Sequence, residues 1–447
     1  MFSIPEIIKV TEGKFIGKKI CSCPAHISLD TRQIKEDEIF LAIKGKNFDG
    51  HDFVKEAVKK KAKAVILEKL PPEIIPIPII LVKDTIRALS QLAAYQRKKF
   101  SPILVAITGS NGKTTTKEML AFLLSTKYKV LKNEGTQNNQ IGLPLTLLKL
   151  EESHKVVVLE LGTNHFGEID YLSKIASPNI GVILNIGPAH LEAFKNIKGV
   201  YKEKSTLIRN LIYPCIGVLN NDDPLLRADL NKKRKEFLVG FGLKGKTDFQ
   251  AKVLKIKDDY IEFLLHQHKL SLHTLGVSNI YNALAALAVC RLLGLDYRLL
   301  SSKMKKFLFP VQRLQIKKIK STTFIDDTYN SNPVSLKEAL DALKRIKNKG
   351  RKIAVLGDMW ELGEKSYQMH QEAGKQFLEI CDIIIGVGKY FSTLKETLKN
   401  NHNKVELFSC VDALQAKDIL FKYIKPTKND IILVKGSRIM RMEEVIK

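Results

Sequence analysis

Short apolar runs alternate with helical patterns in residues 1–98. The runs IFLAI, AKAVILE and PIPIILV have the length of strands, whereas residues 53–62 and 84–99 repeat apolar positions at helical spacing. Prolines at 71, 72, 76 and 78 indicate a surface loop. This part of the chain predicts a small α/β domain.

Continuous apolar runs characterise the second part, residues 99–310. ILVAITG, KVVVLE (155–160) and IGVILN (180–185) lack polar alternation, which is typical of a parallel sheet covered on both faces. Ligands gather at the carboxyl ends of such strands, so we expect the three strand ends to lie near one another. The segment SNIYNALAALAVCRLLGL predicts a helix, and FPVQRLQ follows it as a connector.

Strands and helices alternate again in residues 311–447. TTFIDD, RKIAVLG, CDIIIGVG and NDIILVKG read as strands, with helices predicted at 333–347, 366–380, 390–400 and 412–424. This order is typical of a doubly wound sheet. The sequence therefore predicts an α/β protein of three domains: 1–98; 99–310, a central P-loop domain with a parallel sheet; and 311–447, a Rossmann-like doubly wound sheet.

The net charge limits the classes of possible binding partner but does not select one of them. The 447 residues include 73 Lys and Arg against 47 Asp and Glu, giving +26, which would attract nucleic acid, an acidic membrane or a polyanionic small substrate. The lysines are spread from end to end, as expected for solvated faces. The six cysteines show no repeated spacing, so neither a zinc site nor a disulfide framework is indicated.

The start of the chain and its longest apolar runs bear on location. MFSIPEIIKVTEGKF has no apolar core like that of a signal peptide, and no stretch reaches about 18 apolar residues. We expect a cytoplasmic protein without a transmembrane segment.

The segment TGSNGKTT after the first central strand predicts a phosphate-binding loop. Its glycines let backbone amides point inward, and the following helix adds the positive end of its dipole. Lys113 would pair with the β and γ phosphates, and the Thr114 hydroxyl would bind Mg²⁺. Ile107 stands where the usual pattern has its first glycine, so the loop is shorter than the standard one. The predicted ATP-binding loop consists of Gly109, Ser110, Asn111, Gly112, Lys113, Thr114 and Thr115.

Three more side chains are candidates for the same edge of the sheet. Glu160 ends the strand VVVLE, and His190 follows the strand GVILN, so both suit metal ligands there. Lys204 lies in the helical segment VYKEKSTLI and by default is a solvated lysine. As an ammonium it would repel Mg²⁺, so a metal role requires its conversion by CO₂ to an anionic carbamate.

The chain resembles the Mur ligases, which join an amino acid or dipeptide to a UDP-linked cell-wall precursor. The shortened loop is similar in all of them and in folylpolyglutamate synthases. Five other stretches resemble the MurF type specifically and follow in the expected order along nearly the whole chain. They are LDTRQIKEDEIFLAIKGKNFDGHDF, NNQIGLPLTLL, ELGTNHFGEI, DDTYNSNP and LGDMWELGE.

The resemblance implies a UDP-sugar domain, a central ATPase and a C-terminal domain for the incoming amine. It implies ATP and two Mg²⁺ as cofactors, a carbamylated Lys204, and Lys113, Glu160, His190 and Lys204 as catalytic residues, with Thr114 joining the last three as metal ligands. Further nucleotide contacts would be Asn282, Arg313, Asp327, Tyr329 and Asn330. Substrate contacts would be Thr31, Arg32, Lys44, Asn47, Asp49, His51, Asn138, Asn139, Asn164, Asn332 and Arg438. Ser278 and Ala193 depart from the family pattern, and no role is assigned to Ser278.

The implied reaction is ATP-dependent amide formation between UDP-N-acetylmuramoyl-tripeptide and D-alanyl-D-alanine through an acyl phosphate, with a monomeric enzyme and no nucleic-acid partner. Three alternatives remain open. A MurE-type ligase would add a diamino acid to the dipeptide precursor, but the DNPR-like motif of that type is absent. A basic P-loop NTPase acting on nucleic acid would explain the loop and charge, but it calls for base-stacking aromatics, and aromatics are only 7%. A nucleotide-binding protein without turnover would not need Lys113, Glu160 and His190 together.

Overall fold

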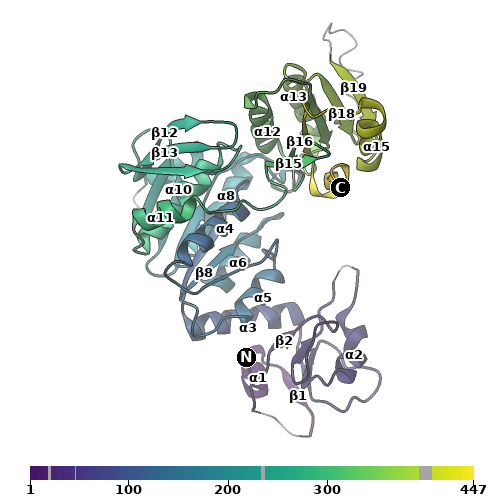
Figure 1. Ribbon diagram of the computed structural model, residues 1–447. Coiled ribbons are helices and arrows are strands. Elements are labelled where there is room, and N and C mark those ends of the chain that lie inside the picture. The colour runs from purple at the N-terminus through teal and green to yellow at the C-terminus, as the bar shows by residue number, and fades with distance from the viewer. Residues whose placement is uncertain (19–21, 46, 233–236, 392–404) are drawn as a thin grey trace.

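The described residues form three β-sheets, placed in chain order from one end of the molecule to the other (Figure 1). The structure, a computed structural model, describes all residues except 19–21, 46, 233–236 and 392–404. The predicted helix at 390–400 falls almost entirely outside the described residues. No helix in the part of the chain that is described combines the length and the apolar character needed to cross a bilayer.

The first sheet has five short strands in the order β1-β5-β4-β3-β2, and only the β1–β5 pair is antiparallel. Its strands are β1 (Lys14–Ile16), β2 (Ile27–Ser28), β3 (Ile39–Leu41), β4 (Ala64–Leu67) and β5 (Ile79–Leu81). Its helices are α1 (Ile4–Thr11), α2 (Val54–Lys59) and α3 (Thr85–Phe100), with a 3-10 turn at Gly50–Phe53.

The long helix α3 joins the first sheet to the central one (Figure 1). Its buried Leu89 and Leu92 share one apolar cluster with Ile66 of the first sheet and with Leu143 and Leu147 of the central part. The predicted boundary after residue 98 falls near the end of this helix. The domain boundaries stay predictions.

The central sheet has nine strands in the order β14-β13-β12-β11-β10-β9-β6-β8-β7. From β7 to β12 neighbouring strands are parallel, and β12, β13 and β14 form an antiparallel extension. The strands are β6 (Ile103–Thr108), β7 (Val130–Lys132), β8 (Val156–Glu160), β9 (Ile180–Ile183), β10 (Ile216–Asn220), β11 (Phe237–Gly242), β12 (Phe249–Ile256), β13 (Ile261–Leu265) and β14 (His268–Leu272). The predicted meeting of three strand ends is confirmed, since β6 lies between β8 and β9.

Helices cover both faces of the central sheet. Successive side chains of β6 point to opposite faces: Val105 and Ile107 pack with α4 and α10, whereas Leu104 and Ala106 pack with α3, α5 and α8. This double burial explains the unbroken apolar runs. The helices are α4 (Lys113–Leu124), α5 (Gly142–Leu148), α6 (Glu168–Ala176), α7 (Leu191–Phe194), α8 (Ile197–Arg209), α9 (Pro224–Leu230), α10 (Asn279–Leu292) and α11 (Tyr297–Met304).

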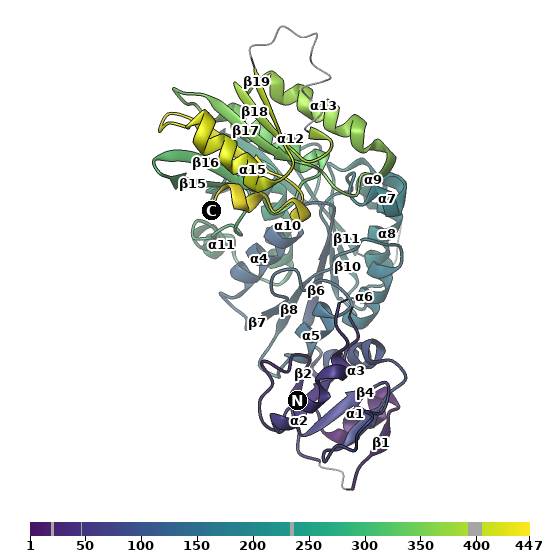
Figure 2. The same cartoon turned by 90° about the vertical axis from the view of Figure 1, so that its right-hand side faces the viewer.

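The third sheet has the order β15-β16-β20-β17-β18-β19, antiparallel only at β15. Buried side chains of β17 divide between two clusters, with α12 and α13 on one face and α15 on the other (Figure 2). The doubly wound prediction is confirmed. The elements are β15 (Gln315–Ile319), β16 (Thr322–Asp327), α12 (Pro333–Arg345), β17 (Lys352–Gly357), α13 (Ser366–Leu378), β18 (Ile383–Val387), β19 (Glu406–Cys410), α15 (Ala413–Asp418), a π-helical turn (Ile419–Ile424) and β20 (Ile431–Lys435).

Candidate active site

The phosphate loop connects β6 to α4 and faces the third sheet. Gly112 has φ +82°, and a Cβ there would lie 2.2 Å from Oδ1 of Asn282, so only glycine lets this amide approach. The Lys113 ammonium donates to the carbonyl oxygen of Gly109 at 2.9 Å, and burial lowers its pKa. Asn185 at the end of the β9 run braces the loop, accepting from the Asn111 amide at 2.9 Å. The predicted loop is therefore pre-shaped by its neighbours.

Glu160 lies directly beside the start of α4. Its carboxylate is 2% exposed and accepts hydrogen bonds from the Thr114 hydroxyl at 2.8 Å and from the Asn138 amide at 2.8 Å. Asn133, directly after β7, accepts the backbone N–H of Glu160 at 2.9 Å. Arg313 donates to the Thr114 hydroxyl at 3.1 Å. The structure places the predicted residues Thr114, Glu160, Asn138 and Arg313 side by side, and their roles stay predictions. Nothing in the sequence singled out Asn133.

His190 and Lys204 complete this edge of the site. His190 precedes α7 with φ +53° and lines the same cavity as Glu160, and its Nδ1 lies 2.5 Å from Oε2 of Glu361. The default expectation of a solvated Lys204 is wrong, because the side chain lies on the inward face of α8 and the residue is 1% exposed. Burial, followed by the charge of Lys113, pushes the pKa of Lys204 well below its ordinary value. Burial thus favours a neutral amine at Lys204.

The donor set at this edge suits a hard divalent cation that keeps phosphate or water ligands. Nowhere in the described ranges do three His, Cys, Asp or Glu side chains cluster as a metal site. The Thr114 hydroxyl and the Glu160 carboxylate offer adjacent oxygens, and His190 lines the same cavity. Mg²⁺ is held in this way, by one or two carboxylates together with substrate phosphates. The residues therefore fit Mg²⁺ bound together with a nucleotide.

The connector and the third sheet supply the other wall of this cavity, which has a volume of about 290 Å³. Arg313 lies over the ring of Tyr329 at 4.1 Å, and Asp327 forms a buried ion pair with Lys435 at 2.5 Å. The side chains of Asn111 and Asn332 exchange hydrogen bonds of 2.7 and 3.4 Å across the cavity. The remaining wall residues include Asn164, Ser278, Asn279, Asn282, Asn330 and Glu338.

The sequence missed two charged residues of this wall. Lys435 ends β20, so its place at the carboxyl end of an apolar strand was a usable signal. Glu338 lies within α12 and accepts the backbone N–H of Ser278 at 2.9 Å. Its contact depends on the packing of two domains and has no local signal.

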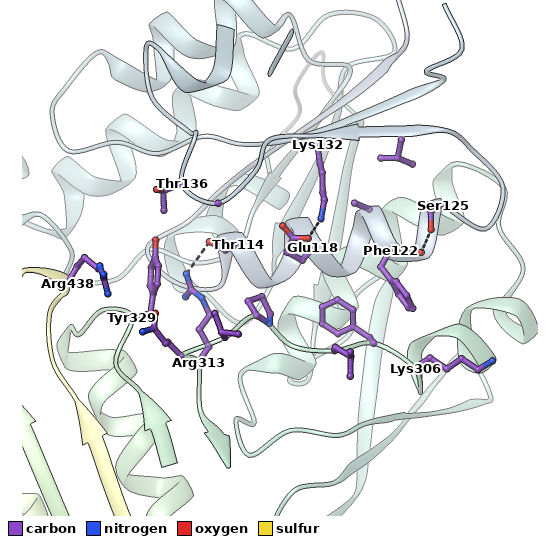
Figure 3. Close-up of a pocket in the computed structure, with 18 residues that line it drawn as sticks. Thr114, Glu118, Phe122, Ser125, Lys132, Thr136, Lys306, Arg313, Tyr329 and Arg438 are labelled. Atoms are coloured by element: carbon purple, nitrogen blue, oxygen red, sulfur yellow. Dashed lines mark hydrogen bonds and ion pairs between the residues drawn. The ribbon is translucent and has the colours of Figure 1, made fainter. Parts of the chain in front are cut away.

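A larger cavity of about 850 Å³ adjoins the first one (Figure 3). Thr114, Thr136, Arg313 and Tyr329 line both. One wall consists of Phe307 and Leu308 just before the connector and of Pro310 and Val311 within it, and Phe122 of α4 also lines the cavity. Lys132, paired with Glu118, and Arg438 add polar groups. A largely apolar space with basic side chains along its lining thus opens beside the phosphate loop.

The candidate residues of the first sheet lie apart from these cavities, as none of them lines either one. His51 and Asp49 form a pair at 2.6 Å, and the His51 backbone N–H, followed by its ring, lowers the pKa of Asp49 to about 2. The Thr31 hydroxyl donates to Glu56 at 2.9 Å, and Arg32 pairs with Asp30 at 2.8 Å. Lys44 and Asp49 form an isolated antiparallel β-bridge through their backbones, and Asn47 lies in the loop between them.

Asn139 differs from its neighbour Asn138. Its side-chain oxygen accepts the backbone N–H groups of Ile141 and Gly142 at 3.1 and 3.0 Å, where α5 begins. It lines neither cavity. Its contact to substrate stays a prediction.

Comparisons with known proteins agree with this architecture. The family models described as "Mur ligase family, catalytic domain", "Mur ligase middle domain" and "Mur ligase, glutamate ligase domain" match residues 25–97, 107–290 and 312–438. The UDP-N-acetylmuramoyl-tripeptide–D-alanyl-D-alanine ligase of Haemophilus influenzae is 34% identical over 99% of this chain and 97% of its own. The ligase of the same name from Bacillus subtilis is 33% identical, covering 100% and 97%.

Solved structures agree as well. MurF from Acinetobacter baumannii superposes with a TM-score of 0.90 at 31% identity, covering 100% of this chain and 98% of its own. MurF from Thermotoga maritima in complex with ADP has a TM-score of 0.81 at 31% identity, covering 94% and 96%. The fold and the site thus define the class of protein, an ATP-dependent ligase built on a shortened phosphate loop. The chain belongs to the Mur ligase family and, within it, to the MurF type.

Proposed function

We propose that the protein joins D-alanyl-D-alanine to UDP-N-acetylmuramoyl-tripeptide at the expense of ATP, as the names of its relatives state for them. The observation that carries this proposal is the set formed by the phosphate loop, Thr114 and Glu160 at the cavity shared by the central and third domains. The full-length similarity to ligases of this name supports the choice of substrates.

The reaction needs the carboxylate to acquire a leaving group. A carboxylate oxygen of the tripeptide bonds to the γ phosphorus of ATP as the bond to the β-phosphate oxygen breaks, releasing ADP. The dipeptide amine then attacks the carbonyl carbon of this acyl phosphate, the C–O bond to phosphate breaks, and the amine loses a proton. Little covalent chemistry falls to the protein, so positioning and charge stabilisation carry the catalysis.

Each part of the nucleotide cavity has a place in that scheme. Loop amides and Lys113 hold the β and γ phosphates, and Arg313 neutralises charge on the transferred group. Asn282 is assigned to the base, and its amide packs against Gly112, where a Cβ would lie 2.2 Å from Oδ1. Asp327, fixed by Lys435, accepts from the ribose, with Tyr329 and Asn330 beside it.

Thr114, Glu160, His190 and a carbamylated Lys204 would hold Mg²⁺, two ions in all. When bound, Mg²⁺ supplies charge neutralisation for the phosphates and the oxyanion. Burial supports the carbamate at Lys204, because only the neutral amine adds CO₂, releasing one proton. The carbamate then puts a negative charge where the ammonium of Lys204 would repel Mg²⁺, and this charge adds to that of Glu160.

The two organic substrates approach from different sides. Thr31, Arg32, Lys44, Asn47, Asp49 and His51 would hold the uridine diphosphate, and Asn138, Asn139 and Asn164 the muramoyl peptide. The larger cavity suits the dipeptide, because its apolar connector wall fits two methyl groups and Arg438 can pair with the carboxylate. Asn332 would border both substrates near the reaction centre.

The cytoplasm is the expected location, since ATP and UDP-linked precursors are supplied there, and a monomer suffices because one chain carries the whole site. The MurE-type and nucleic-acid alternatives have no observation in their favour. The third residue of the peptide, lysine or diaminopimelate, is left to experiment.

Phosphate release tests the proposal when UDP-N-acetylmuramoyl-tripeptide, D-alanyl-D-alanine and ATP are each omitted in turn. We expect release only when all three are present. Turnover that continues without D-alanyl-D-alanine would contradict the proposal. Turnover with the UDP-linked dipeptide precursor and a diamino acid would assign the protein to the MurE type instead.

A further inference from the structure

An acidic side chain from the third domain reaches the histidine of the central site. Glu361 follows β17 within the stretch LGDMWELGE, and its Oε2 lies 2.5 Å from Nδ1 of His190. Its backbone carbonyl also accepts the N–H of Glu192 at 3.3 Å. The 3-10 turn at Gly363–Lys365 packs on α7 beside it. His190 is therefore held from the opposite domain.

The backbone is unusual on both sides of this contact. His190 has φ +53° and Glu361 has φ +65°, which places two residues with side chains in the left-handed region. Such conformations cost free energy and persist where the surroundings fix them, most often at functional sites. Both residues of the contact thus lie in turns with a conformation that residues with side chains seldom adopt.

The contact favours one of the two ring tautomers. A carboxylate oxygen 2.5 Å from a bare ring nitrogen would bring two lone pairs together, so the contact favours the hydrogen on Nδ1, although the two atoms do not meet hydrogen-bond geometry. In the neutral ring Nε2 then carries the free lone pair, which can bind a metal ion. His190 lines the nucleotide cavity, where a metal ligand is needed.

We propose that Glu361 is a positioning residue that fixes His190 with Nε2 free for the metal ion, so that docking of the third domain completes the metal site. This inference rests on the proposed function only in taking His190 as a metal ligand. A carboxylate behind a ligating histidine raises its basicity and fixes its orientation. Because coupling is reciprocal, metal and nucleotide also stabilise the docked domain.

The test measures the metal itself, without either peptide substrate. Mn²⁺ binding to the protein saturated with ADP is followed by electron paramagnetic resonance for the full-length chain and its variants. We expect Glu361→Ala to weaken Mn²⁺ binding about 10- to 100-fold, the range seen for such partners. Glu361→Gln, which keeps an acceptor oxygen, should lose less. Glu364→Gln changes an exposed carboxylate of the same loop and should bind as the parent does.

A double-mutant cycle separates positioning from damage to the fold. In a His190→Ala background, Glu361→Ala should have no further effect on Mn²⁺ affinity, because its route to the metal is gone. Additive losses, or unchanged affinity in Glu361→Ala itself, would overturn the inference. A failure of the ligase assay would leave this result standing, since no tripeptide or dipeptide takes part.

Discussion

At the scale of single residues, burial changes what a side chain can do. Lys204 has the sequence setting of a solvated helix lysine, yet it is enclosed between α8 and the sheet, near the charges of Lys113, Glu203 and Glu160. Lys202, two residues earlier on the same helix, is exposed. The two lysines therefore form a matched pair for testing the carbamate.

We predict that Lys204→Ala lowers kcat at least about 100-fold, the order seen when one group that stabilises developing charge is removed. Short carboxylic acids such as acetate should restore part of the activity, because they can replace the carbamate in the space that the side chain leaves. Phosphate release with and without added acid measures this. Lys202→Ala should be fully active and insensitive to acetate, and full activity in Lys204→Ala would refute the carbamate.

We predict that Gly112→Ala abolishes tight nucleotide binding, raising the dissociation constant for ADP more than about tenfold by forcing Asn282 away from a strained turn. A Cβ at Gly112 would lie 2.2 Å from Oδ1 of Asn282 at φ +82°. Gly135→Ala is the control, since Gly135 also has positive φ, +49°, but its Cβ would meet no atom within 4 Å. Calorimetric titration with ADP compares them, and equal losses would assign the effect to backbone strain alone.

At the scale of elements, the ends of helices carry much of the local information. Helix α1 begins with a capping box in which Ser3 and Glu6 bond each other's backbone N–H groups. The backbone N–H of Ser3, and to a lesser degree Lys99, lowers the pKa of Glu6 from 4.5 to about 2. Helix α1 packs on α3, so this cap also supports the joint between two sheets.

The pKa of Glu6 predicts how the cap depends on pH. Since its pKa is depressed in the folded state, its contribution is complete above about pH 4.5 and is lost as pH falls toward 2. Denaturant unfolding between pH 6 and pH 3 should therefore show the parent and Glu6→Gln converging at the acid end. Glu12→Gln serves as control. A constant difference across this range would contradict the assignment.

At the scale of the whole molecule, the two joints differ in composition. The first and central sheets share one apolar cluster through α3. The third domain meets the central one through polar contacts such as Asn111–Asn332, Glu338–Ser278 and Glu361–His190, with apolar contacts at Leu275 and Met369 beside them. An apolar joint resists separation, but hydrogen-bonded surfaces can part and exchange with water. The third domain is therefore the part we expect to move during turnover.

We predict that Leu92→Ala destabilises the first and central sheets together by about 2 to 5 kcal/mol, the usual cost of such a core deletion. The chain has one tryptophan, Trp360, and it lies in the third domain. Leu92→Ala should thus shift the unfolding transition seen by circular dichroism and leave that of Trp360 fluorescence in place. Leu356→Ala, in the core of the third domain, should shift the Trp360 fluorescence transition and leave the unfolding of the first and central sheets in place. Coincident shifts in both signals would mean that the molecule unfolds as one unit.

The sequence by itself determined the elements and the chemistry that depends on local pattern. Apolar runs marked β6, β8 and β9, glycine spacing marked the phosphate loop, and strand ends located Glu160 and His190. These features follow from backbone geometry and strand polarity, which neighbouring residues encode.

The tertiary structure alone decided which side chains lose contact with water and which meet across domains. The burial of Lys204 near Lys113, the ion pair of Lys435 with Asp327, and the approach of Glu361 to His190 bring together residues that are 91, 108 and 171 positions apart in the sequence. No local pattern encodes such contacts, because they arise from the packing of separate sheets. The sequence thus indicated the reaction, and the packing determined the surroundings of the charged side chains at the site.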